Sequence, residues 1–146
     1  MTDRNRSVGF IFGDIARFRG ITFDQLMKPF GLTLAQAYVL NYLFRQDGLT
    51  QIELAEHMDV GTVTVSGLVD RLEARGWVKR KTDVKDRRAK QVWLTRESDA
   101  VRKEMIKQFK ELNNVTLDGI TDDEIEVLCD LLSRVRKNLS TNLDRS

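Results

Sequence analysis

The 146-residue chain contains one proline, one cysteine and one histidine, and these scarcities exclude several classes of protein. The single proline, Pro29, favours long uninterrupted helices. The single cysteine, Cys129, excludes an intrachain disulfide, which fits a reducing compartment. The sequence also lacks an N-terminal apolar signal segment and any run of 18 apolar residues. We therefore predict a cytoplasmic protein without a membrane span.

Catalytic chemistry is not expected from the residues present. His57 is the only histidine and lies far along the sequence from Cys129, so none of the usual sets of nucleophile, base or metal ligands is available. Acidic residues at 122–124 and 126 match a metal site in composition, but acids in the first turn of a helix commonly balance the helix dipole. The sequence therefore predicts a protein that is not an enzyme and requires no cofactor or metal.

Charge is distributed unevenly along the chain. The basic window, residues 75–96, holds nine Lys or Arg against two Asp, a net charge of +7, whereas the remaining residues carry −5. Strand-forming residues at both ends of this window predict a β-hairpin whose tip displays Lys85, Arg87 and Arg88. A basic hairpin after a helix is typical of winged-helix proteins that contact a nucleic acid backbone. The alternative is an exposed basic hairpin with no partner.

Apolar residues recur with helical spacing in six segments. The predicted helices run from residue 7 to 28, from a cap at Thr33 to Asp47, from 50 to 58, from 62 to about 76, from about 96 to 117, and from 121 to 139. Capping boxes, in which a threonine and a glutamate exchange hydrogen bonds with backbone N–H groups, are expected at Thr50 and Thr121. The predicted fold class is mostly α with a small β-hairpin wing.

Two of these helices form a helix-turn-helix pattern. The segments 50–58 and 62–76 are joined by the turn Asp59-Val60-Gly61. The outer face of the second helix carries small or hydrogen-bonding residues, namely Thr62, Val63, Thr64, Ser66, Gly67, Asp70 and Arg71. We predict contacts to DNA base edges from the first four, although hydroxyl groups at the start of a helix also serve as caps. Arg71 is expected either to contact DNA or to pair internally with Asp70 or Glu73.

The terminal helices carry apolar stripes that have no evident partner. The first helix has Val8, Ile11, Ile15 and Phe18, and the last has Ile125, Leu128, Leu132, Val135 and Leu139. Because the helix-turn-helix segment is nearly self-sufficient, we expect the terminal helices to pack together, partly within the chain and partly with a second copy in an isologous dimer. Cys129 is expected to be a small core residue rather than a redox sensor.

Several motifs stand in order along the chain: Leu32-Thr33-x-x-Gln36, Leu54-Ala55, Leu68-Val69-Asp70-Arg71-Leu72-Glu73, Gly76, Asp83-x-x-Asp86-Arg87-Arg88 and Leu94-Thr95. Together they resemble the MarR family of winged helix-turn-helix transcriptional regulators, and look closest to its SlyA-like branch. The resemblance implies one domain over residues 1–146, with a DNA-binding lobe at 32–95 and dimerisation helices at 1–30 and 96–146. It also implies a homodimeric transcription regulator or repressor that binds a pseudo-palindromic site in double-stranded DNA.

The resemblance also implies roles for the residues of the hairpin tip. By position, Arg88 enters the minor groove, Asp86 orients Arg88, and Arg87 serves backbone or internal pairing. A guanidinium suits the negative potential of a narrow groove and is less strongly hydrated than an ammonium. Lys85 completes the predicted DNA-binding residues of the wing.

The sequence departs from the family pattern at two places. Many relatives carry an arginine where this chain has Gly67, and glycine offers no hydrogen bond to a base. Base readout then depends on residues 62–64 and on Ser66, so we predict an A·T-rich operator recognised largely by its shape. After Thr95, a glycine common in relatives is replaced by Glu97-Ser98, and we expect Thr95 to cap the following helix.

In relatives, a crevice between the dimerisation helices and the DNA-binding lobe holds small aromatic anions. The candidate ligand-binding residues here are Arg17, Phe18, Gln36 and Tyr38, with Arg17 paired to a carboxylate. An ordinary core with arginines on the helix surface remains an equal alternative. For the protein as a whole, the alternative function is an architectural or RNA-binding winged-helix protein without operator specificity.

Overall fold

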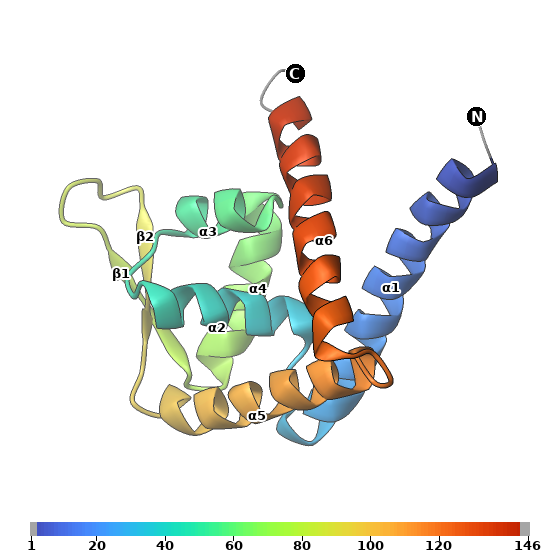
Figure 1. Cartoon of the computed structure of the whole chain (residues 1–146). Helices are drawn as coiled ribbons and strands as arrows, with labels where there is room; N and C mark the ends of the chain where they lie inside the picture. Colours follow the sequence, from blue (N-terminus) through green and yellow to red (C-terminus); the bar gives the residue numbers. More distant parts are fainter. Residues whose placement is uncertain (1–2, 144–146) are drawn as a thin grey trace. The chain divides into compact units, whose positions relative to one another are not determined.

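A computed structural model describes residues 3–143 of the chain, and the side chains of residues 7–143. The elements are α1 (Asp3–Met27), a 3-10 helix η1 (Lys28–Phe30), α2 (Leu34–Arg45), α3 (Gln51–Met58), α4 (Thr62–Ala74), β1 (Val78–Thr82), β2 (Lys90–Leu94), α5 (Ser98–Thr116) and α6 (Asp122–Leu143) (Figure 1). The prediction of a mostly helical chain with a two-stranded hairpin is confirmed. The chain divides into two compact units, Met1–Leu112 and Asn113–Ser146.

Helix starts follow the capping chemistry of the sequence in most cases. The Thr50 hydroxyl accepts from the Glu53 N–H at 3.1 Å, and the Glu53 carboxylate accepts from the Thr50 N–H at 2.7 Å, which confirms that capping box. Thr33 forms a similar box with Gln36. The prediction for Thr95 is wrong, because α5 begins only at Ser98 and the Thr95 hydroxyl donates instead to the Gly76 carbonyl.

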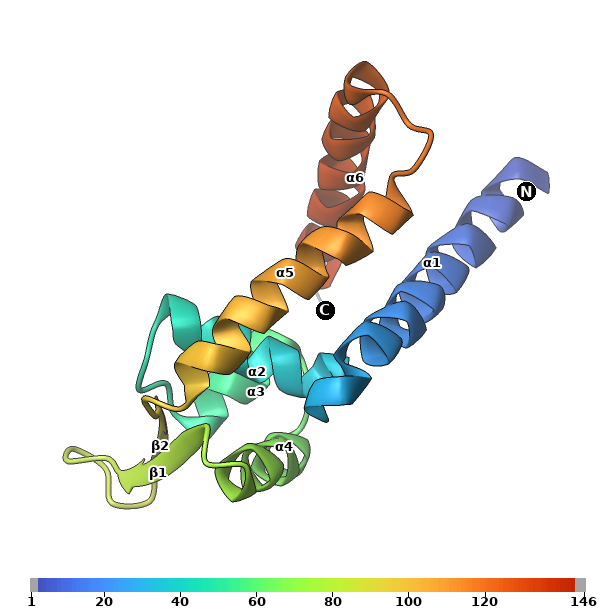
Figure 2. The ribbon, with the colours of Figure 1, turned by 90° about the horizontal axis from the view of Figure 1, so that it is seen from below.

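The core of the first unit gathers side chains from α1 to α5. It includes Phe23, Met27, Ala37, Leu40, Leu43, Leu54, Val65, Leu68, Val69, Leu72, Val78, Val92, Val101, Met105 and Leu112. On α2, Leu43 is buried and Phe44 is only partly buried. The rings of Phe23 and Phe109 lie 4.6 Å apart and join α1 to α5. Figure 2 shows α2, α3 and α4 grouped beside the hairpin, with α5 alongside α2.

The hairpin is attached to the helices by its own backbone. Strands β1 and β2 are antiparallel, with Val78 opposite Leu94 and Thr82 opposite Lys90. The segment before α3 adds to β2, because the Val92 N–H donates to the Leu49 carbonyl at 2.8 Å and the Gly48 N–H donates to the Val92 carbonyl at 3.1 Å. The base of the wing is thereby fixed to the start of the helix-turn-helix.

Gly48 gives a stability test of this attachment. Its φ is +77°, and an added Cβ would lie 2.5 Å from Cζ2 of Trp93, whereas Gly76 has φ +75° and open space around it. Both alanine substitutions carry the strain of left-handed backbone, about 1–2 kcal/mol. We expect Gly48→Ala to lower the free energy of unfolding by at least about 1 kcal/mol more than Gly76→Ala, because only Gly48 also crowds an aromatic ring. Urea denaturation of both variants measures the difference, and equal losses would contradict the packing at Trp93.

Helix α1 leaves most of its apolar stripe uncovered. Val8, Ile11, Ile15 and Phe18 are 48%, 54%, 48% and 56% exposed. The core contacts of α1 come from its last turns, at Phe23 and Met27. An exposed apolar stripe of this length makes α1 a candidate interaction surface.

Within the second unit, α6 begins with the predicted capping box at Thr121. The Glu124 carboxylate accepts from the Thr121 N–H at 2.9 Å, and hydrogen bonds from the Thr121 backbone and side chain lower the pKa of Glu124 below its usual value. No residue of α6 is buried. Its exposed apolar residues include Val127, Leu131, Leu132, Leu139 and Leu143.

The prediction that Cys129 is a core residue is wrong, because its side chain is exposed. The whole of α6 lacks buried residues, so Cys129 shares the exposure of its helix. Among the described residues, no helix has the length and apolar character needed to cross a membrane.

Candidate nucleic-acid interface

Helix α4 buries one face and presents the opposite face to solvent. Val65, Leu68, Val69 and Leu72 are buried, as their spacing predicts. The residues before and between them are mostly open: Thr62, Val63 and Thr64 are exposed, with Val63 at 85%. The N-cap is Gly61, which has no side chain to bond the first N–H groups. The first turn of α4 is therefore accessible to solvent, and the hydroxyl and methyl groups of residues 62–64 are exposed.

Gly67 lies on this accessible face, and an added Cβ would meet nothing within 4 Å. Alanine favours an α-helix over glycine by about 1 kcal/mol. We expect Gly67→Ala to raise the free energy of unfolding by about that amount. Gly61→Ala is the control, because Gly61 is an N-cap, where alanine is the poorer residue. Thermal unfolding of both variants tests this, and a loss of stability in Gly67→Ala would show that the position is constrained.

Two aspartates organise the tip of the wing. The Asp83 carboxylate accepts from the Lys85 N–H, and the Asp86 carboxylate accepts from the Arg88 N–H, both at 2.9 Å. These are side-chain turns that mimic backbone turns. Asp86 thus holds the backbone of Arg88 rather than its guanidinium. The structure places Lys85, Arg87 and Arg88 together in this exposed loop.

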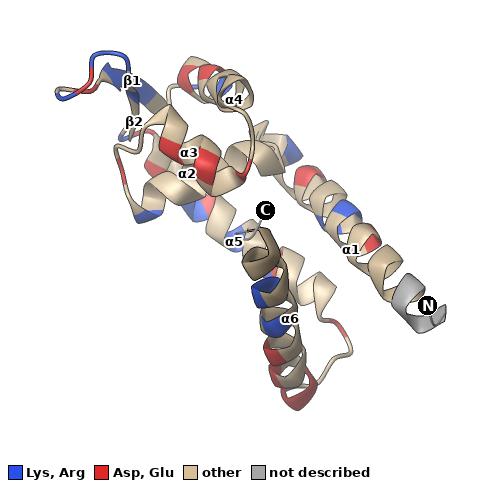
Figure 3. Cartoon of the chain, turned by 90° about the horizontal axis from the view of Figure 1, so that it is seen from above, with Lys and Arg blue, Asp and Glu red and all other residues tan. Residues whose placement is uncertain are grey.

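Two arginines of the basic window donate hydrogen bonds to acceptors within the protein. Arg75 donates to the Phe30 carbonyl at 2.7 Å, and its guanidinium lies 4.3 Å from the Trp77 ring. Arg80 donates to Gln51, Ser66, Asp70 and Glu73. The remaining positive charge is concentrated along β1 and at the hairpin tip (Figure 3). The net charge of the window therefore overstates the number of cations available to a polyanion.

Arg71 is exposed on α4. The internal pairing considered for it does not occur, because the ion pairs of Asp70 and Glu73 run to Arg80, at 2.6 and 3.1 Å. Arg71 therefore remains on the solvent face with residues 62–64. Ser66 is less accessible than these, since it is half-buried and its carbonyl accepts from Arg80 at 2.9 Å.

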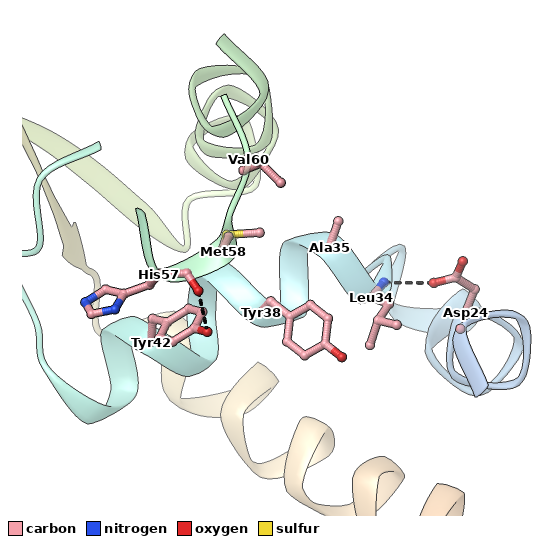
Figure 4. Close-up of a pocket in the computed structure, with 9 residues that line it drawn as sticks. Asp24, Leu34, Ala35, Tyr38, Tyr42, His57, Met58 and Val60 are labelled. Carbon is pink, nitrogen blue, oxygen red and sulfur yellow. Dashed lines mark hydrogen bonds between the residues drawn. The ribbon is translucent and has the colours of Figure 1, made fainter. Parts of the chain in front are cut away.

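A cavity of about 520 Å³ opens in the first unit between α1, α2 and the end of α3 (Figure 4). Its lining residues are Gly20, Asp24, Leu34, Ala35, Tyr38, Tyr42, His57, Met58 and Val60. The Tyr42 hydroxyl donates to the His57 carbonyl at 3.0 Å, and the two rings stack with centroids 5.1 Å apart. The Asp24 carboxylate accepts from the Leu34 N–H at 2.8 Å. The lining is mainly apolar and aromatic, with one carboxylate and no lysine or arginine among its nine residues.

Of the four predicted ligand-binding residues, only Tyr38 lines this cavity. Arg17 pairs with Asp14 at 2.7 Å and lies 4.8 Å from the centre of the exposed Phe18 ring. Gln36 is 7% exposed, and its side-chain oxygen accepts from the Thr33 N–H at 3.0 Å, so it belongs to a helix cap. Arg17 therefore belongs to an exposed ion pair and Gln36 to a helix cap, and neither lines the cavity.

Sequence reasoning missed Arg80 and Asp24. Arg80 was counted only as one cation of the hairpin, although its place two residues after the buried Val78 puts it on the inward face of β1. Asp24 carries no local signal, because its partner Leu34 belongs to another helix. Among residues 3–143, no group of three or more His, Cys, Asp or Glu is arranged to hold a metal ion.

Known proteins resemble the chain over nearly its whole length. The MarR family profile matches residues 30–89. The chain is 28% identical over 139 residues to an uncharacterized HTH-type transcriptional regulator, YybA of Bacillus subtilis (strain 168), covering 95% of this chain and 90% of YybA. The structure of the transcriptional regulator PA3341 is 31% identical and has a TM-score of 0.78, covering 92% of this chain and 98% of PA3341.

A third similar protein is BpsR of Bordetella bronchiseptica, whose DNA binding is regulated by 6-hydroxynicotinic acid. It is 26% identical with a TM-score of 0.78, and the match covers 88% of this chain and 92% of that chain. The profile match contains the helix-turn-helix and the hairpin tip, and the likeness to transcriptional regulators extends to the terminal helices. The protein belongs to the MarR family of winged helix-turn-helix, DNA-binding transcriptional regulators.

Proposed function

We propose that the protein is a homodimeric regulator that recognises a pseudo-palindromic, A·T-rich operator, with α4 in the major groove and the wing in the adjoining minor groove. The observation that carries this proposal is that α4, with its accessible first turn, and the hairpin, with its exposed cationic tip, belong to one compact unit. Residues 62–64, Ser66 and Arg71 would face the major groove. Lys85, Arg87 and Arg88 would face the backbone and minor groove, with Asp86 shaping the loop.

The side chains on the exposed face of α4 suit recognition of DNA groove shape and of thymine methyl groups better than recognition of guanine. Gly67 places no side chain at the middle of that face, and Val63 offers an exposed apolar group suited to a thymine methyl. The nearest guanidinium on the helix is that of Arg71, one turn further along. Operator specificity would therefore depend on A·T-rich groove shape together with short side chains. An invariant guanine contacted from the centre of α4 would contradict this reading.

The exposed stripes of α1 and α6 support the dimer. Each helix displays apolar side chains that a single chain leaves in water. Burial of such surface in a symmetric contact is the usual way that a chain of this kind forms a dimer. Two recognition helices about one turn of DNA apart would then follow from the two-fold axis. The domain boundaries at 32–95 and the SlyA-like assignment remain predictions.

The cavity supports control by a small aromatic ligand. Its volume lies in the range of small-molecule sites, and Tyr38 and Tyr42 offer aromatic surfaces. His57, Met58 and Val60 place one wall on the turn that leads into α4, so an occupant contacts the segment that positions α4. A ligand that prefers one arrangement of this turn changes DNA affinity by its differential binding. BpsR provides a relative that responds to an aromatic compound.

The charge of the effector is a separate question. A carboxylate ligand would meet Asp24 in the lining, and Arg17 would have to leave Asp14 to reach it. The lining therefore favours a neutral aromatic compound over the predicted anion. Operator affinity measured with benzoic acid and with benzamide distinguishes the two, because only the neutral compound is expected to change it. An equal or stronger response to the acid would restore the aromatic anion.

The test of the proposed function is selection from random-sequence DNA duplexes at near-physiological salt. A regulator enriches an inverted repeat with half-sites about 10 base pairs apart and prefers it to a scrambled duplex by about 10³-fold or more. Fluorescence anisotropy measures that preference. A pool that never enriches would favour the architectural or RNA-binding alternative, since such a protein binds unrelated duplexes with similar affinity.

A further inference from the structure

Arg80 occupies the junction between the wing and the helix-turn-helix. Its Nε donates to Gln51 of α3 at 2.6 Å, and its Nη2 donates to the Asp70 carboxylate of α4 at 2.6 Å and to the Ser66 carbonyl at 2.9 Å. Its Nη1 donates to one Glu73 oxygen, and its own backbone N–H donates to the other, both at 3.1 Å. One guanidinium therefore ties a strand of the wing to both helices.

The side chain of Arg80 is only 18% exposed, whereas those of Asp70 and Glu73 are 66% and 44% exposed. Arginine suits such a place because its planar fork fixes several acceptors in one geometry, which a lysine does not do. Protein acceptors take four of the five N–H donors of Arg80. Arg80 thus has little capacity left for a phosphate, in contrast to the exposed cations of the hairpin tip.

Three of the four acceptor residues, Ser66, Asp70 and Glu73, lie on α4, the helix proposed to face DNA. Asp70 and Glu73 place negative charge on α4, and unpaired carboxylates there would repel the phosphate backbone. The ion pairs with Arg80 offset part of that charge. They also hold β1 at one angle to α4, through partners 7, 10 and 14 residues away in the chain.

We propose that Arg80 is a positioning residue for operator recognition, which sets the wing against α4 so that Arg88 and the start of α4 reach DNA together. Arg80 acts through Arg88 and α4 and does not itself contact DNA. This inference rests on the proposed function. In this proposal, a partly buried arginine fixes the position of the wing relative to α4.

A double-mutant cycle on the full-length protein tests the coupling. Operator affinity is measured by anisotropy for the wild type, Arg88→Ala, Arg80→Met and the double variant. If Arg80 positions the wing, Arg88→Ala costs about 100-fold in the wild type and less than about 10-fold once Arg80 is methionine, because the wing is already misplaced. An Arg88→Ala cost that is the same in both backgrounds overturns the proposal.

Two controls keep the result interpretable. Lys79→Met removes one positive charge from an exposed neighbouring position of β1, and the cost of Arg88→Ala should stay near its wild-type value in that background. Arg80→Lys keeps the positive charge but loses the planar guanidinium, and should reduce the cost of Arg88→Ala as Arg80→Met does. If circular dichroism shows that Arg80→Met does not fold, Arg80→Lys replaces it in the cycle. A wild-type cost of Arg88→Ala in the Arg80→Lys background would overturn the geometric role of Arg80.

Failure of the proposed function gives a different result. A wild-type protein that prefers no duplex would refute the proposed function itself, before the double-mutant cycle is measured.

Discussion

Ile15→Glu is expected to convert the protein to a monomer and to weaken operator binding by about 1,000-fold. Ile15 lies in the middle of the exposed α1 stripe and is itself 48% exposed, so the substitution should leave the fold of the single chain intact. In the dimer, a carboxylate at this place would be buried without a partner, which costs several kcal/mol. A monomer then binds one half-site at a time and loses the gain from bivalent binding, about 10²–10⁴-fold.

Light scattering coupled to gel filtration measures the mass of the Ile15→Glu variant, and anisotropy measures its operator affinity. Gln25→Glu is the matched control, because it adds the same charge at an exposed polar position of the same helix. We expect the control to remain dimeric with unchanged affinity. A dimeric Ile15→Glu protein with wild-type affinity would remove α1 from the interface.

Arg88→Ala is expected to weaken operator binding by about 100-fold and to reduce its salt dependence. A hydrogen bond to a charged group contributes about 1.5–3 kcal/mol. One dimer carries two wings, and two losses at the lower figure give about 3 kcal/mol, or roughly 100-fold in affinity. Each phosphate contact releases counterions with a slope of about −0.9 in log affinity against log salt. Loss of two such contacts lowers the steepness by about 1.8.

The matched control for Arg88→Ala is Lys110→Ala, which removes an exposed positive charge from α5, away from the wing. Titrations at several salt concentrations should give the wild-type slope for the control. The Asx turn at Asp86 bonds the backbone N–H of Arg88, so the alanine variant should keep the loop conformation. An unchanged slope and affinity in Arg88→Ala would place that guanidinium outside the DNA contact.

Much of the fold was predictable because its signals are local. Capping boxes at Thr50 and Thr121 join residues three positions apart, and the buried stripe of α4 follows from helical spacing alone. The hairpin follows from strand formers on either side of a polar turn. Local hydrogen bonds of this kind form in almost any tertiary context, so the sequence determines them.

The site was less predictable because hydrogen-bond and ion-pair partners depend on which helix and strand faces pack together, and the sequence does not show this. Thr95 has the chemistry of a helix cap, but Gly76 lies close enough to accept its hydroxyl. Gln36 has the chemistry of a ligand contact, but its amide belongs to the cap of α2. An internal pair of Arg71 with Asp70 or Glu73 was the alternative to DNA contact because these residues are neighbours on one helix, whereas those carboxylates bind Arg80 from another element.

The sequence by itself determined the order and type of the elements, the basic hairpin, the small residues on the face of α4 and the family resemblance. Tertiary structure alone decided which cations of the basic window bind acceptors within the protein, since Arg75 reaches Phe30 across 45 positions and Arg80 reaches Gln51 across 29. It also decided that the cavity carries Asp24 rather than Arg17. The physical reason is that charge and hydrogen-bonding capacity belong to a residue, but their use depends on the partners that packing brings within about 3 Å.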